Sequence, residues 1–332
     1  MPNQHTGPTV KNKVIRELLL EFPNSSKSNL GKIAFERYPH LFDNPESARM
    51  MVRQLTGAAG ERNKKLTRNI MEHKPQLPPS NCKEREFQVL PKECNNILWL
   101  SDVHIPNQDN EAIELAVEYG KKNDVNCIVL GGDILDNTPF TSHDAPPPGL
   151  DDVRTWFQYA KQFIEYLKYQ FPKAKFYWIE GNHDAWIKRY LIKKAPILFS
   201  DEYYHLPQRM KLDELGVKFF AEHVVLMAGK LQMHHGHTMI RGVFAPVNAA
   251  RGLFLRVKSN AIIGHVHTTS HHVEKTLKGE TIGTWSVGCL CTLAPDYDPH
   301  GTKHNLGFAH ILVEKNGNFK VNNIAIHEGR II

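Results

Sequence analysis

The sequence predicts an α/β fold, in which a two-layer sandwich of sheets is flanked by helices and preceded by a small all-α unit. Short apolar runs of strand length precede polar segments, and helical patterns cover residues 110–122, 151–171 and 184–194. The last hundred or so residues are mostly strand-like, including 309–313 and 319–326. A chain of 332 residues has room for one or two such domains.

Residues 1–73 are predicted to form a three-helix domain. Apolar residues share one stripe in 11–22, and a second short helix over 29–38 ends before a proline. The third helix, 45–55, begins with a proline, which suits the first turn of a helix.

The positive charge of the chain lies in this N-terminal part. Residues 1–75 hold 13 Lys plus Arg against 7 Asp plus Glu, whereas the remainder holds 28 of each. Three short helices, with a basic third helix and the basic run 62–68 behind it, resemble a helix-turn-helix DNA-binding unit. The resemblance implies contact with DNA or another nucleic acid through residues 1–75, and docking of a protein is the alternative.

A proline-rich segment separates this unit from the rest of the chain. Residues 74–95 contain four prolines and are predicted to be a partly extended linker. The region that follows, 96–332, has a length within the range of a single domain.

Five short polar segments occur in one order along 96–332, and each of the first three follows an apolar run. The runs 97–100, 127–130 and 176–179 have the length and composition of strands that are buried on both faces. The segments are S-D-V-H at 101–104, G-G-D-I-L-D at 131–136, G-N-H-D at 181–184, H-H-G-H at 234–237 and G-H-V-H at 264–267. Because open α/β sheets place their chemistry where strands end, the segments predict an enzyme site.

These segments supply seven oxygen and nitrogen donors, enough for two divalent cations. The donors are Asp102, His104, Asp133, Asn182, His235, His265 and His267. Asp102 and His104 are two residues apart, so an extended backbone would direct both side chains to one face. The same spacing separates His265 from His267. A set of carboxylate, amide and imidazole without thiolate favours Mn, Fe or Zn in a hydrolytic role over a structural cysteine-rich site.

The ordered segments D-x-H, G-D-x-x-D, G-N-H-D, H-G and G-H-x-H resemble the calcineurin-like metallophosphoesterase superfamily over roughly residues 96–332. The resemblance implies two divalent metal ions, with Mn²⁺ as the first choice and Fe or Zn as alternatives. It implies two ligand groups bridged by Asp133: Asp102, His104 and His267 for one metal, and Asn182, His235 and His265 for the other. A hydroxide between the metals would be the nucleophile, because metal binding lowers the pKa of water.

The resemblance also implies roles around the metals. His183 would donate a proton to the leaving-group oxygen, and Asp136 would fix its ring and favour the imidazolium form, with a turn-capping role as the alternative for Asp136. Asp184 would support the site from behind the ligands. His237 and Arg241 are candidates for contact with a substrate phosphate, and a surface position is the alternative for each.

Three function classes follow for a phosphate-ester substrate. A phosphodiesterase or nuclease acting on nucleic acid or nucleotides is favoured by the basic N-terminal unit and by resemblance to the DNA-repair exonuclease branch. A phosphomonoesterase or protein Ser/Thr phosphatase is the alternative, but Asn137 stands where such phosphatases carry Arg, and Asp184 where they carry Glu. A non-catalytic binding module is disfavoured because no ligand position is substituted.

The composition of the chain predicts a cytoplasmic location. No apolar run approaches the length that spans a bilayer, and the N-terminal residues lack the apolar core of a signal peptide. The five cysteines are odd in number and have no metal-knuckle spacing, so free thiols in a reducing cytoplasm are expected, with no membrane partner.

Overall fold

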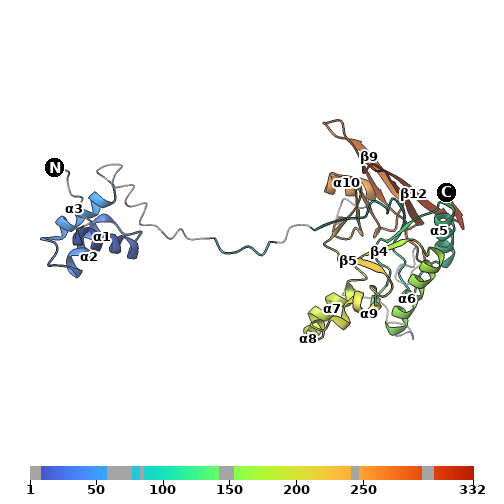
Figure 1. Cartoon of the computed structure of the whole chain (residues 1–332), viewed down its shortest axis with the longest axis horizontal. Coiled ribbons are helices and arrows are strands. Elements are labelled where there is room, and N and C mark those ends of the chain that lie inside the picture. Colours follow the sequence, from blue (N-terminus) through green and yellow to red (C-terminus); the bar gives the residue numbers. More distant parts are fainter. Residues whose placement is uncertain (1–8, 58–76, 83–85, 142–152, 241–246, 294–302) are drawn as a thin grey trace. The chain divides into compact units, whose positions relative to one another are not determined.

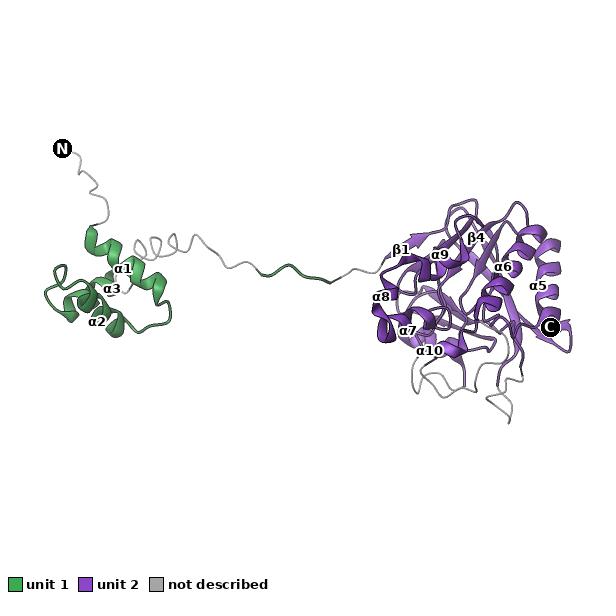
Figure 2. Ribbon diagram, turned by 90° about the horizontal axis from the view of Figure 1, so that it is seen from below, with its two compact units in different colours: residues 1–82 green, residues 83–332 purple. Residues whose placement is uncertain are grey.

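The computed structural model describes residues 9–57, 77–82, 86–141, 153–240, 247–293 and 303–332. The chain forms two compact units, residues 1–82 and 83–332, shown in different colours in Figure 2. No helix in the described part of the chain is both long enough and apolar enough to cross a bilayer.

The N-terminal unit contains three helices, α1 (Val10–Glu21), α2 (Lys27–Arg37) and α3 (Pro45–Leu55). Polar caps begin two of them: the Ser26 hydroxyl accepts a hydrogen bond from the main chain of α2, and the Asn44 side chain accepts one from Ser47 in α3. The apolar faces of the three helices share one small core, which includes Ile15, Leu30 and Val52.

Helices α2 and α3 approach closely at Gly31. A β-carbon added at Gly31 would lie 2.9 Å from the main-chain oxygen of Pro45 and 2.9 Å from the main-chain nitrogen of Arg49. Only a residue without a side chain therefore allows this packing distance.

The second unit is built on two sheets (Figure 1). The first has the order β13-β12-β11-β2-β3-β4-β5. Its strands are β2 (Asn96–Leu100), β3 (Cys127–Leu130), β4 (Lys175–Ile179), β5 (Val217–Phe220), β11 (Leu306–Val313), β12 (Phe319–His327) and β13 (Arg330–Ile331). Strands β2 to β5 are mutually parallel, and β11 joins β2 in the antiparallel sense.

The second sheet has the order β1-β6-β7-β8-β10-β9. Its strands are β1 (Phe87–Val89), β6 (Val225–Ala228), β7 (Leu231–His234), β8 (Ala261–Ile263), β9 (Ser270–Lys275) and β10 (Thr281–Ser286). β1 lies within the segment 74–95 that was predicted to be a linker, and it pairs with β6 in this sheet. Leu90 and Cys94, just after it, are buried between the sheets.

Helices cover the outer faces of both sheets. They are α5 (Asn110–Lys122), α6 (Val153–Gln170), α7 (Trp186–Lys194), α8 (Pro196–Phe199), α9 (Leu206–Met210) and α10 (Ala249–Val257), with short 3-10 turns η1 (Thr138–Phe140) and η2 (Glu202–Tyr204). One core joins α5 and α6 to the seven-stranded sheet, a second fills the space between the sheets, and a third joins α10 to β8. The predicted fold class is confirmed.

Successive side chains along a central strand point alternately into two of these cores, as the two-residue period of a β-strand requires. On β2, Leu98 and Leu100 face the helices, whereas Ile97 and Trp99 face the other sheet. Both faces are therefore apolar, which explains why the central strands appear in the sequence as continuous apolar runs.

Candidate metal centre

The predicted donors come together at the carboxyl ends of strands from both sheets. Residues 102–104 follow β2, residue 133 follows β3, 182–183 follow β4, residue 235 follows β7, and 265–267 follow β8. Because these strands run in parallel within each sheet, their following loops meet along one edge of the sandwich.

The first group of donors surrounds the ring of His267. Its Nε2 atom lies 3.3 Å from Oδ1 of Asp102 and 3.2 Å from Nε2 of His104. Oδ2 of Asp133 lies 3.9 Å from the same nitrogen of His104. All four side chains are buried.

The second group shares Asp133 with the first. Oδ2 of Asp133 lies 3.0 Å from Nε2 of His235, which in turn lies 3.0 Å from Oδ1 of Asn182. A donor atom of His265 lies within 4.8 Å of donors from Asp133 and His235. The carboxylate of Asp133 therefore lies between the two groups.

The chemistry of this donor set fits divalent cations. Asp102 and Asp133 are fully buried carboxylates, which are costly to bury without positive charge nearby. Nδ1–H of His235 donates to the carbonyl of Gly131 at 2.9 Å, so its Nε2 atom is the nitrogen that faces the other donors. Nδ1–H of His104 donates in the same way to the carboxylate of Asp136 at 3.0 Å. Such outer hydrogen bonds orient metal-binding histidines.

Burial and charge separate the pKa values of two facing histidines. Burial lowers the pKa of His235, but the charge and hydrogen bond of Asp133, together with the charge of Asp102, outweigh burial and raise the pKa to about 9. Burial and the neighbouring ring of His235 lower the pKa of His265 to about 3. In the metal-free chain a proton on His235 thus partly balances the buried carboxylates.

The backbone is left-handed rather than extended at five of the seven donors. The φ angles are 56° at Asp102, 50° at His104, 52° at Asp133, 66° at His265 and 53° at His267. The prediction that an extended backbone directs each D-x-H or H-x-H pair to one face is therefore wrong. Because non-glycine residues adopt this region at an energetic cost, surrounding contacts must hold the loops in place.

Asp184 supplies much of that support. Its carboxylate accepts five hydrogen bonds at 2.9 to 3.1 Å, from the main chain of Gly181, Asp133, Ile134 and Leu135 and from the indole of Trp178. Burial and the charge of Asp133 raise the pKa of Asp184 to about 6, against the effect of these donors. The side chain thus joins the loop after β3 to the loop after β4.

Gly181 allows the same two loops to touch. A β-carbon at Gly181 would collide with Oδ1 and the main-chain nitrogen of Asp133. The glycine of the G-N-H-D segment is therefore a steric requirement for the position of Asp133.

His183 lies over the first group of donors. Its Nδ1–H donates to the main-chain oxygen of Asp136 at 2.7 Å, and its ring centroid lies 4.4 Å from that of His104. A donor atom of His183 also lies within 4.8 Å of donors from His104 and Asp133. Burial lowers the pKa of His183, but the charges of Asp133 and Asp136 raise it above its ordinary value.

Asn137 is a site residue whose role the sequence did not indicate. Its side-chain amide donates to the main-chain oxygen of His183 at 3.0 Å, and its own φ is 52°. Asn is one of the few residues that adopt this conformation readily, and an Asn directly after Asp136 is the only signal in the sequence.

Of the two residues predicted to contact substrate, the structure describes His237 but not Arg241. Nε2 of His237 lies 2.9 Å from Oε2 of Glu222, and its ring centroid lies 6.0 Å from that of His265. The hydrogen bond from His237 lowers the pKa of Glu222 to about 2. Arg241 lies outside the described residues.

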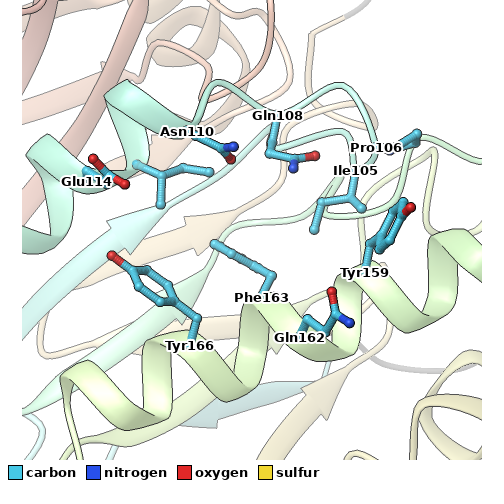
Figure 3. Close-up of a pocket in the computed structure, with 10 residues that line it drawn as sticks. Ile105, Pro106, Gln108, Asn110, Glu114, Tyr159, Gln162, Phe163 and Tyr166 are labelled. Atoms are coloured by element: carbon cyan, nitrogen blue, oxygen red, sulfur yellow. The ribbon is translucent and has the colours of Figure 1, made fainter.

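A pocket of about 420 Å³ lies beside the loop that follows His104. Figure 3 shows aromatic and amide side chains from α5, α6 and this loop around it. They include Tyr159, Phe163, Tyr166, Gln108, Asn110 and Gln162, with Ile105 and Pro106 at the loop.

Solved structures with a similar fold are only distantly related in sequence. A phosphoesterase from E. coli, YfcE, is 16% identical with a TM-score of 0.36, and the match covers 71% of this chain and 96% of that one. Vps29 from Entamoeba histolytica is 12% identical with a TM-score of 0.36, covering 71% and 96%. The nuclease MPE from Pseudomonas putida is 14% identical with a TM-score of 0.29, covering 68% and 85%. No curated protein matches the sequence.

The match to a family model is more extensive. The calcineurin-like phosphoesterase model matches residues 96–287, which contain all seven donors and the loops that carry them. This family implies a dinuclear metal site, and the buried donors around Asp133 fit one. The chain belongs to the calcineurin-like phosphoesterase family.

Proposed function

We propose that the chain is a dinuclear metal-dependent phosphodiesterase or nuclease that acts on nucleic acid or nucleotides. The observation that carries the proposal is the carboxylate of Asp133, which faces both His104 and His235 from between two groups of donors. Two bound cations would supply Lewis acidity at phosphorus and would lower the pKa of water held between them.

The metal ligands in this proposal are the seven predicted residues. Asp102, His104 and His267 would hold one cation, Asn182, His235 and His265 would hold the other, and Asp133 would contribute to both. Mn²⁺ remains the first choice, with Fe or Zn as alternatives, because imidazole, amide and carboxylate suit all three.

His183 donates the proton that the leaving-group oxygen needs. Its Nδ1–H is held by the main-chain oxygen of Asp136, so Nε2 is the nitrogen that exchanges a proton with substrate. Asp136 and Asn137 position the ring and the main chain of His183 respectively. In this proposal His237 and Arg241 contact the substrate phosphate.

Two features favour nucleic acid or a nucleotide as the substrate. The N-terminal unit is basic, and phosphate backbones attract clustered Lys and Arg. The pocket beside the loop that follows His104 offers aromatic rings and side-chain amides, the groups that stack on bases and bind their edges, together with the carboxylate of Glu114. The alternatives are a phosphomonoesterase or protein phosphatase, and an N-terminal unit that binds protein. We place the activity in the cytoplasm, because the five cysteines are free.

A substrate panel tests the proposal. The purified chain, loaded with Mn²⁺, is assayed on p-nitrophenyl phosphate, bis-p-nitrophenyl phosphate, cyclic nucleotides and linear or single-stranded DNA. We expect the diesters and DNA to be hydrolysed faster than the monoester. Hydrolysis of the monoester alone would favour the phosphomonoesterase.

The variant Asp133→Asn tests the bridging role in the same assay. The amide lacks the second anionic oxygen, so elemental analysis should find fewer than two metals per chain and activity should be lost. Retention of two metals would contradict the assignment of Asp133.

A further inference from the structure

Cys291 lies beside the first group of donors, and the proposed function makes no use of its thiol. The residue follows β10 and is buried. Its sulfur and one ring nitrogen from each of His104 and His267 lie within 4.8 Å of one another. Donors at this spacing are within reach of one cation, because metal–sulfur and metal–nitrogen bonds are about 2.3 and about 2.0 Å long.

The main chain around Cys291 is hydrogen-bonded to the loop that carries two of the proposed ligands. The contacts are the N–H of Leu290 to the oxygen of Asp102 at 3.0 Å, the N–H of Asp109 to the oxygen of Leu290 at 2.9 Å, and the N–H of Thr292 to the oxygen of Asn107 at 2.9 Å. The main chain of Cys291 also pairs with that of Gln108 in an isolated antiparallel β-bridge. The main chain that carries the sulfur is therefore held against the loop of Asp102 and His104.

Cys94, another buried cysteine of this unit, serves as a comparison for Cys291. Cys94 packs between the two sheets, and its sulfur lies 3.5 Å from the hydroxyl of Tyr177. Its neighbours are apolar side chains, the thiol of Cys127 and the phenol of Tyr177. Cys291, in contrast, lies beside two imidazoles as well as the thiol of Cys289.

We propose that the thiolate of Cys291 is an additional ligand of the cation held by Asp102, His104 and His267. When the metal–sulfur bond forms, the S–H proton passes to water, so no oxidant or reductant takes part. The inference rests on the dinuclear centre proposed above and adds metal selectivity to it. Thiolate is a soft ligand that favours zinc or iron over manganese, whereas the second group offers only nitrogen and oxygen.

Cobalt substitution tests the proposal on the full chain. Co²⁺ bound to thiolate absorbs in the near ultraviolet through charge transfer from sulfur, whereas Co²⁺ bound only to nitrogen and oxygen lacks this band. We expect the wild-type chain to bind two cobalt ions by elemental analysis and to show the band. Cys291→Ser should lose the band, and the matched control Cys94→Ser should keep it.

The outcomes separate this inference from the proposed function. Two bound cobalt ions without the band in the wild-type chain would overturn the role of Cys291 and leave the dinuclear centre intact. A band that survives in Cys291→Ser would also overturn it, because another cysteine would then be the ligand. Failure of the wild-type chain to bind cobalt would refute the dinuclear centre itself.

A second measurement needs no variant, in case Cys291→Ser does not fold. X-ray absorption on the zinc-loaded wild-type chain should find a sulfur neighbour at about 2.3 Å, averaging to less than one sulfur per zinc. A zinc shell made only of nitrogen and oxygen would overturn the proposal.

Discussion

At the scale of single residues, hydrogen bonds that the histidine rings donate determine which nitrogens face the centre. Nδ1–H of His235 is bound to the carbonyl of Gly131 and Nδ1–H of His183 to that of Asp136. A carbonyl only accepts, so each ring is held with Nε2 directed elsewhere. For His235 that nitrogen faces the carboxylate of Asp133. A donor atom of His183 lies instead near donors of both His104 and Asp133. In the proposed function these surroundings make His235 a metal ligand and His183 a proton donor.

Replacing His183 by Ala should slow hydrolysis without removing metal. A general acid contributes about 100- to 10,000-fold, and it matters most when the leaving group is poor. We therefore expect a loss of that size on DNA or alkyl diesters and a small loss on p-nitrophenyl diesters, measured as kcat at saturating substrate.

The matched control is His327→Ala, because His327 is an exposed histidine on β12. It should leave kcat unchanged on both kinds of ester. Equal losses on activated and unactivated esters in His183→Ala would speak against proton donation.

Affinity for the cation of the second group should rise with pH up to about 9. The pKa of His235 is raised to about 9 in the metal-free chain, and only its neutral ring binds a cation. Below that pH one proton leaves His235 for each metal bound at the second group, so affinity should fall about tenfold per pH unit. Zinc titration calorimetry at several pH values, in buffers of different ionisation enthalpy, measures both affinity and proton release. An affinity independent of pH would contradict this account.

At the scale of elements, the loops that follow the strands carry the candidate site, and the helices pack against the sheets. Strand β3 and helix α5 match their predicted ranges, because a buried apolar run and a capped amphipathic pattern are local signals. Apart from the Asn at 137, the left-handed conformations in the loops have no local signal, because hydrogen bonds from distant segments stabilise them. Asp184, for example, bonds to three successive residues at 133–135.

In the N-terminal unit, Gly31→Val should force α2 and α3 apart. The new side chain would meet the backbone of α3 at 2.9 Å, and overpacking of this kind costs about 1 to 3 kcal/mol. Hydrogen exchange of the full chain, measured by mass spectrometry, should be faster in Gly31→Val than in wild type across 10–55. Exchange rates in 86–332 should be unchanged. The exposed neighbour Lys32→Ala is the control and should not change exchange. Unaltered protection in Gly31→Val would show that the helices adjust without cost.

At the scale of the whole molecule, charge and chemistry are divided between the two units. The excess of basic residues lies in 1–75, whereas every proposed metal ligand lies in 83–332. If the N-terminal unit brings the chain to nucleic acid, the two activities should separate.

Deleting residues 1–75 should abolish salt-sensitive retention on DNA and spare hydrolysis of bis-p-nitrophenyl phosphate. Phosphate contacts release counterions, so retention by the full chain should fall steeply between low and moderate salt. The single variant Arg53→Gln, at an exposed position on α3, should reduce the salt dependence of DNA retention while the N-terminal unit stays folded. Full retention after the deletion would assign DNA binding to another part of the chain, and capture of a protein partner instead would support the alternative.

The sequence alone determined the fold class, the central strands, the three N-terminal helices and the motifs that carry the donors, because apolar periodicity and motif order are properties of the chain itself. It also led to the expectation of a linker over 74–95, part of which pairs as β1 with a strand more than a hundred residues away. Only the tertiary structure decided the left-handed backbone at five of the proposed ligands, the support from Asp184 and Asn137, and the position of Cys291. Each of these depends on contacts between segments far apart in sequence, which no local pattern records.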